Sequence, residues 1–121
     1  MPFPFIYTRR MPKCSATGIK TLIRCFFFFY DSTDCLGYAI DYAGQRFVIM
    51  TDCGSVNEEM EHYISTANHL VIEANHDEHL LLNGPYPTYL KQRILSPRGH
   101  QSNDTCGELL VRNYHEGLRN V

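Results

Sequence analysis

The stretch LGYAIDYAGQRFVIMTDCG, residues 36–54, decides the fold of this chain. Two apolar runs, Leu36–Tyr42 and Gln45–Thr51, flank a short turn that contains glycine. Such a pair of runs indicates a β-hairpin. The second run ends in a small polar loop with Asp52 at its tip. Loops held at the end of a strand commonly carry functional groups. The hairpin therefore predicts a sheet with a candidate functional carboxylate at its edge.

The segments around this hairpin predict further strands and helices. Thr21–Tyr30 is rich in β-branched and aromatic residues and favours a strand, and a short buried strand is predicted within Asn68–Glu73. A helix is expected from a cap at Ser55 or Asn57 to about Ala67. It should bury Met60, Tyr63 and Ile64. Three more helices are expected over 78–82, over 87–94 and after Ser102 or Asn103, the last with an apolar stripe of Leu109, Leu110 and Tyr114. This order predicts an α/β fold in which helices pack on one face of a mixed or largely antiparallel sheet.

Length, charge and hydropathy restrict the class of protein. The 121 residues suffice for one compact domain. The net charge of −2 gives no bulk electrostatic reason for binding nucleic acid or a membrane. The longest apolar cluster, Cys25–Tyr30, is far shorter than a membrane-spanning helix. Five cysteines without a CxxC pair predict free thiols in a reducing compartment, and thus a cytoplasmic location.

The chain divides into two unequal parts. Residues 1–20 are basic, contain three prolines and no acidic side chain, and are expected to form an irregular lead-in. Residues 21–121 are expected to form the folded domain. A targeting role for the basic end has little support, because no apolar segment precedes a small-residue cleavage site.

Several polar residues at predicted strand ends and loops could carry chemistry. Asp and His side chains together suit a divalent metal such as zinc or manganese, although each could equally be a turn, cap or surface residue. A Cys–His nucleophilic pair, with Cys53 or Cys106 beside His100, stays open as an alternative. The sequence contains neither a phosphate-binding loop motif nor a GxSxG motif. The candidate residues are Asp31, Asp52, Glu73, His76, Asp77 and His100.

Several short motifs that recur in order resemble the C-terminal half of metallo-β-lactamase-fold hydrolases. They are FVIMTDCG at 47–54, LVIEANHDE at 70–78, GPYP at 84–87, LKQRI at 90–94 and GHQSN at 99–103. The nearest branch is the bacterial one related to phosphodiesterases and nucleases, and the resemblance covers about residues 28–121. It implies a four-layer αββα sandwich, of which this chain would form a part.

The resemblance also implies roles for three residues. Asp52 would be the carboxylate that bridges two zinc or manganese ions. His100 would be a proton donor near the leaving group, with Glu73 as its orienting partner. The family's reaction is the hydrolysis of a phosphodiester, with nucleic acid as one substrate, by water that the two metal ions activate.

Other parts of the family pattern are missing from these 121 residues. The motif HxHxDH, which supplies most metal ligands, occurs nowhere. Tyr30 stands where the family has a ligand histidine, and the chain stops before the final ligand. One carboxylate does not hold a catalytic zinc, which needs about three protein ligands. We therefore expect a fragment or degenerate relative of the hydrolases that is inactive alone.

Two alternatives stay open. The chain could be a half-enzyme completed by a separate chain that bears HxHxDH, or a binding or oligomerisation module without catalysis. In each case the sheet face that packs on the other half in the family would be exposed, together with the apolar run Cys25–Phe29. Self-association is therefore expected.

Overall fold

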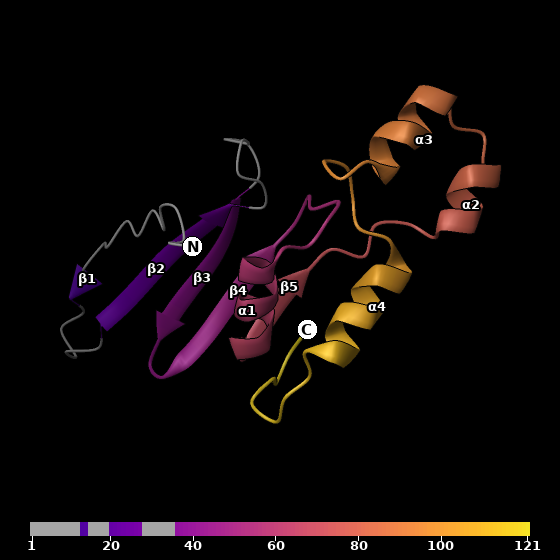
Figure 1. Cartoon of the computed structure of the whole chain (residues 1–121). Helices are drawn as coiled ribbons and strands as arrows, with labels where there is room; N and C mark the ends of the chain where they lie inside the picture. Colours follow the sequence, from indigo (N-terminus) through magenta and orange to yellow (C-terminus); the bar gives the residue numbers. More distant parts are fainter. Residues whose placement is uncertain (1–12, 15–19, 28–35) are drawn as a thin grey trace.

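The computed structural model describes residues 13–14, 20–27 and 36–121, with side chains from residue 37 onward. Strands come first and helices dominate the second half of the chain (Figure 1). The elements are β1 (Lys13–Cys14), β2 (Lys20–Phe27), β3 (Leu36–Tyr42), β4 (Gln45–Met50), α1 (Glu58–Thr66), β5 (His69–Ile72), α2 (Glu78–Asn83), α3 (Thr88–Leu95) and α4 (Asn103–Arg112).

The five strands form one mixed sheet in the order β1-β2-β3-β4-β5. Neighbours from β1 to β4 pair antiparallel, whereas β4 and β5 pair parallel. The predicted hairpin is confirmed. Its turn residues, Ala43 and Gly44, both have positive φ angles (50° and 73°), as in the turns whose twist matches that of the flanking strands. The parallel pair places the C-terminal ends of β4 and β5 at the same edge of the sheet. Asp52 follows the end of β4, and Glu73 follows the end of β5.

The hydrophobic core lies between one face of the sheet and α1. The strands contribute Ala39, Val48, Met50 and Leu70, all at most 3% exposed. From α1, Met60, Tyr63 and Ile64 are buried, as predicted. The helix begins after Asn57, whose side chain accepts a hydrogen bond from the Met60 amide at 2.9 Å. This capping bond satisfies one of the amides that a helix N-terminus leaves unpaired.

The opposite face of the sheet carries large apolar side chains that are not buried. The register sets Tyr38 opposite Ile49 and Ile49 beside Val71, so these three side chains share one face. They and Phe47 are exposed, Val71 by 55%. Figure 1 shows α1 across β4 and β5, with α4 beyond the β5 edge. The expected α/β fold, with helices on one face of a mixed sheet, is confirmed.

The remaining helices follow the prediction with one correction. Ser102 caps α4, and its side chain accepts from the Thr105 amide at 3.2 Å. Leu109 is buried, and Leu110 packs against the core. Tyr114 is not part of this stripe. It is 70% exposed because the helix ends at Arg112, which breaks the helical spacing that the prediction assumed. Within the described segments, no helix has both the length and the apolar character needed to cross a bilayer.

Only part of the N-terminal region is described, so only part of the predictions for it can be compared with the structure. Within the expected irregular lead-in, Lys13–Cys14 pairs with β2 as strand β1. The strand expected over Thr21–Tyr30 is described as far as Phe27. Tyr30 and Asp31, and the side chains of the run Cys25–Phe29, lie outside the described part of the chain.

Candidate metal and acid–base site

Two loops meet beyond the end of β4 because two glycines allow their backbones to touch. A β-carbon on Gly54 would collide with the carbonyl oxygens of Ser96 and Pro97. A β-carbon on Gly99 would collide with carbonyl oxygens of the last turn of α3. The Gly99 amide donates to the Ser96 carbonyl at 2.8 Å. Only glycine permits this close packing of the two backbones. The packing brings His100, which follows Gly99, beside Asp52, which precedes Gly54.

A third loop joins these two from the end of β5. The Asn75 amide donates to the Gln101 carbonyl at 2.9 Å, and the Asn103 amide donates to the His76 carbonyl at 2.8 Å. His76 and Ser102 form a parallel bridge. The segment that follows β5 therefore pairs with the segment that leads into α4, and this pairing fixes Glu73 relative to His100.

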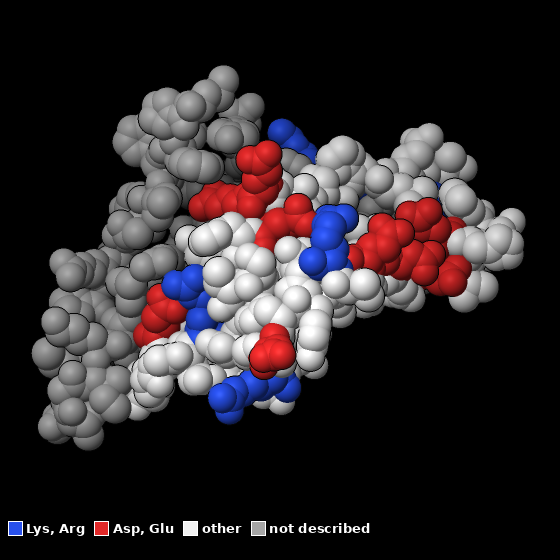
Figure 2. All heavy atoms as spheres, turned by 60° about the horizontal axis from the view of Figure 1, so that its bottom comes forward, with Lys and Arg blue, Asp and Glu red and all other residues white. Residues whose placement is uncertain are grey.

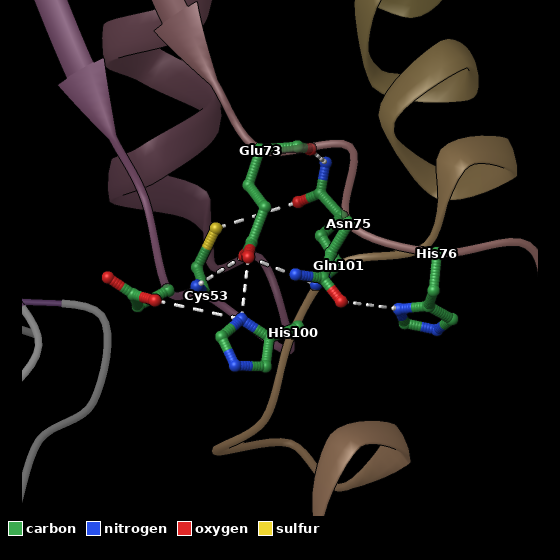
Figure 3. Close-up of polar contacts among 7 residues, drawn as sticks. Cys53, Glu73, Asn75, His76, His100 and Gln101 are labelled. Atoms are coloured by element: carbon green, nitrogen blue, oxygen red, sulfur yellow. Dashed lines mark hydrogen bonds and ion pairs between the residues drawn. The ribbon is translucent and has the colours of Figure 1, made fainter. Parts of the chain in front are cut away.

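The carboxylate of Glu73 lies at the centre of the three loops (Figure 3). Its Oε1 accepts from His100 Nδ1 at 2.6 Å. Its Oε2 accepts from the Cys53 amide at 3.3 Å and from the Gln101 amide at 3.4 Å. The side chain is only 11% exposed. A carboxylate so nearly buried is stable only when it is hydrogen-bonded, and these three donors supply that stabilisation.

The contact with Glu73 determines the protonation pattern of the His100 ring. An ionised carboxylate can only accept hydrogen bonds, so Nδ1 of His100 carries the proton. In the neutral ring Nε2 is then the basic nitrogen, and in the charged ring Nε2 is a second donor. The Nδ1 atom also lies 3.6 Å from Asp52 Oδ1, which is too long for a hydrogen bond but close enough for an ion pair with a protonated ring.

Asp52 presents its carboxylate at the surface of this cluster. Its side chain is 72% exposed, and its φ of 59° is left-handed. Aspartate tolerates this conformation better than most residues, and the turn directs the chain from β4 into the loop that contains Gly54. Asp52 and His100 also line an open pocket of about 410 Å³, together with Asn75, Leu90, Arg93, Ile94, Arg98 and Gly99.

One member of this cluster, Asp52, suits contact with a divalent metal ion. Atoms of Asp52, Glu73 and His100 that could bind a metal all lie within 4.8 Å of one another. Carboxylate oxygen and imidazole nitrogen are ligands for zinc and manganese. Since Glu73 already accepts three hydrogen bonds, the exposed carboxylate of Asp52 is the group that best fits contact with an ion. The fold thus brings together the three residues to which the resemblance assigns roles. Of the other candidates, Asp77 caps α2 and His76 lies outside this cluster, whereas Asp31 lies outside the described residues.

The alternative Cys–His pair does not form between the described residues. Cys53 is fully buried, and its thiol donates to Gln101 Oε1 at 3.6 Å rather than to His100. Burial raises the pKa of the Cys106 thiol, although a hydrogen bond with Gln101 opposes this. A thiol with a raised pKa is a weak nucleophile. Neither cysteine is therefore arranged for attack on a substrate.

Gln101 is a structural residue of the site that sequence reasoning missed. It is 2% exposed, and its Nε2 donates to the Glu73 carbonyl at 3.3 Å. Its amide oxygen faces Cys53, so one side chain links the loops after β4 and β5 (Figure 3). The only signal in the sequence was its place directly after His100, because a buried glutamine cannot be distinguished from a surface one by composition.

The chain matches curated relatives, whereas no protein-family model matches it. Exodeoxyribonuclease WalJ of Streptococcus pneumoniae is 46% identical over 68 residues, which is 56% of this chain and 25% of the relative. Exodeoxyribonuclease YycJ of Bacillus anthracis is 37% identical over 75 residues, which is 62% of this chain and 28% of the relative. The chain is a partial relative of these nucleases.

The matches confirm the resemblance to the nuclease branch of the metallo-β-lactamase fold over the C-terminal part of the chain. The matched stretches are shorter than the 94 residues of 28–121 over which the motifs resemble the family. The chain spans about a quarter of the length of the curated relatives. Nuclease activity is therefore assigned to this chain only as a proposal.

Proposed function

We propose that this chain carries one part of the active site of a metal-dependent deoxyribonuclease. The observation that supports the proposal is the convergence of Asp52, Glu73 and His100 from three loops of a chain whose relatives are named exodeoxyribonucleases. In this proposal Asp52 is a ligand to a divalent zinc or manganese ion. When bound, such an ion lowers the pKa of a coordinated water and neutralises charge on the phosphate.

His100 is proposed to be the proton donor. Its Nδ1–H is held by Glu73 at 2.6 Å, and this leaves Nε2 to deliver a proton to the leaving oxygen of the phosphodiester. Glu73 stabilises the charged imidazole and fixes its orientation, as a second carboxylate does in other acid–base pairs. Glu73 is thus a positioning residue. Its carboxylate oxygens already accept hydrogen bonds from other residues of the site, so it is not proposed as a metal ligand.

The chain alone is proposed to be inactive, because Asp52 is its only exposed carboxylate in the cluster and a catalytic zinc needs about three protein ligands. A chimera tests this division of roles. Residues 47–121 replace the corresponding section of Exodeoxyribonuclease YycJ, and exonuclease activity is measured after the fold is checked by thermal melting. We expect an active chimera that loses activity with Asp52→Ala and is strongly impaired with His100→Ala. A folded chimera whose activity is indifferent to Asp52→Ala would refute the proposal.

The exposed sheet face supports a second candidate function, that of a half-enzyme or interaction module. This face presents an exposed apolar surface on which another sheet could pack. The surface consists of Tyr38, Phe47, Ile49 and Val71. The partner would be a chain bearing HxHxDH or a second copy of this chain. Because Cys106 is a buried free thiol, we place this assembly in the reducing cytoplasm.

Sedimentation of the chain over a range of concentrations tests the second candidate. We expect reversible self-association that is weakened by the double substitution Ile49→Thr and Val71→Thr. The control is Val111→Thr, which changes an 81% exposed valine on α4. A chain that stays monomeric at every concentration, or that associates equally in all variants, would exclude this face as the contact surface.

A further inference from the structure

The pocket beside Asp52 and His100 has a wall that the proposed chemistry does not use. The last turns of α3 contribute Arg93 and Ile94, and the loop that follows contributes Arg98. The backbone of this loop is held firmly, because the His100 amide donates to the Ile94 carbonyl at 2.9 Å. Two arginines therefore line the same pocket as the candidate metal ligand and the candidate acid.

These two arginines differ from Arg46 and Arg112, which are held in ion pairs. Arg46 pairs with Asp41 at 2.7 Å, and Arg112 pairs with Glu61 at 2.6 Å. Arg93 and Arg98, by contrast, make no ion pair with any residue from 37 to 121.

The neighbouring Lys91 has a different task. Its Nζ donates to the Leu82 carbonyl at 2.6 Å, so it holds the end of α2. Among residues 37–121, ion pairing therefore leaves Arg93 and Arg98 available for a ligand.

A guanidinium group has a planar set of donors that matches the oxygens of a phosphate. We propose that Arg93 and Arg98 bind phosphate groups of a DNA strand and hold the strand beside Asp52 and His100. The inference rests on the proposed function, since it assigns the substrate side of the same site. Leu90 and Ile94, which line the pocket beside the arginines, provide an apolar surface for the deoxyribose.

The wider surface favours this local mode of binding. The chain has a net charge of −2. On the face shown in Figure 2, acidic side chains form several groups, the largest at the right, while Lys and Arg lie in small separate groups. Such a surface does not attract a polyanion as a whole. Phosphate recognition by this chain thus depends on a few cations in a defined position.

The test measures binding rather than cleavage. A fluorescent single-stranded oligonucleotide is titrated with the chain in EDTA at several salt concentrations, for the wild type, Arg93→Gln and Arg98→Gln. Arg119→Gln is the matched control, since Arg119 is exposed and lies outside the pocket. We expect each pocket substitution to weaken binding about three- to tenfold and to reduce the slope of log affinity against log salt by about one. The control should match the wild type.

Two further binding experiments test where the bound phosphate lies and which phosphate of the strand it is. Asp52→Asn should tighten binding in EDTA, because it removes a negative charge next to the phosphate. Oligonucleotides with and without a 5′-phosphate identify the source: loss confined to the phosphorylated strand assigns a terminal phosphate, and equal loss with both assigns the internal phosphodiester.

Pocket variants that bind like Arg119→Gln, with an unchanged salt slope, would overturn the inference. So would an Asp52→Asn variant with unaltered affinity. Neither result affects the chimera experiment, which depends on cleavage and on Asp52, so failure of the inference and failure of the proposed function can be told apart. Thermal melts of each variant confirm that a loss of binding is not a loss of fold.

Discussion

Gly54 packs directly against the carbonyl oxygen of Ser96, with no space for a side chain between them. This contact joins the loop after β4 to the loop after α3, and it sets the distance between Asp52 and His100. The candidate site is therefore built by backbone packing as much as by the side chains that would carry out the chemistry.

Replacing Gly54 by alanine should both destabilise the fold and separate the two loops. Overpacking typically costs about 1–3 kcal/mol, and here the obstacle is backbone that cannot move aside cheaply. Thermal and urea unfolding measure this cost.

Gly107→Ala is the matched control for Gly54→Ala. Gly107 lies within α4, and a β-carbon there meets nothing within 4 Å. Alanine at this position should stabilise the helix by about 0.5–1 kcal/mol. A Gly54→Ala variant as stable as the wild type would show that the loops do not pack as described.

The hydrogen bond between His100 and Glu73 predicts an unusual neutral tautomer. With Nδ1 donating to Glu73 Oε1, the proton of the neutral ring is on Nδ1. Nitrogen chemical shifts of labelled histidine report this directly. Glu73→Leu removes the acceptor, and the ring should then shift towards the Nε2–H form.

His115 is an internal reference for this measurement. Its Nδ1 accepts from the Gly117 amide at 3.2 Å, so its neutral ring carries the proton on Nε2. Its signals should not change in Glu73→Leu. If His100 has the Nε2–H form in the wild type, the orienting role of Glu73 is wrong.

The contact between α1 and α4 predicts a pH-dependent contribution to stability. Hydrogen bonds from Asn113 and Arg112 lower the pKa of Glu61 below its ordinary value of 4.5. A depressed carboxyl pKa adds stability that is present above the unfolded-state pKa and is lost as the pH falls through the folded-state pKa. Because the pair is partly exposed, its contribution is about 0.5 kcal/mol.

Urea unfolding of wild type and Glu61→Gln at several pH values tests this contribution. The variant should be less stable at neutral pH, and the difference should shrink as the pH falls below about 4.5. Glu58→Gln, on the same helix but without an ion pair to the described residues, should show no such trend. A constant difference between wild type and Glu61→Gln across the pH range would contradict the assignment.

Much of the local structure could be predicted from the sequence, since it depends on short-range signals. The hairpin turn at Ala43-Gly44, the Asn57 cap and the buried face of α1 follow from turn chemistry, capping and periodicity. The end of α4 was predicted less well. The apolar spacing continued to Tyr114, whereas the helix ends at Arg112.

The site could be predicted only in part. Asp52, Glu73 and His100 were singled out by their positions in motifs that resemble a nuclease family, and the fold brings them together. The role of Gln101 and the close packing at Gly54 depend on contacts between loops that are far apart in the chain. Single-residue patterns carry no information about such contacts.

Metal binding at Asp52 tests the central claim most directly. The chain is dialysed, its metal content is measured by elemental analysis, and Mn²⁺ is then titrated while backbone amide signals are followed by NMR. We predict that no metal is retained through dialysis, and that weakly bound Mn²⁺ broadens signals around Asp52 and His100 first. Asp52→Ala should abolish this broadening. Broadening that is unchanged in Asp52→Ala, or that centres on the acidic first turn of α1, would contradict the account.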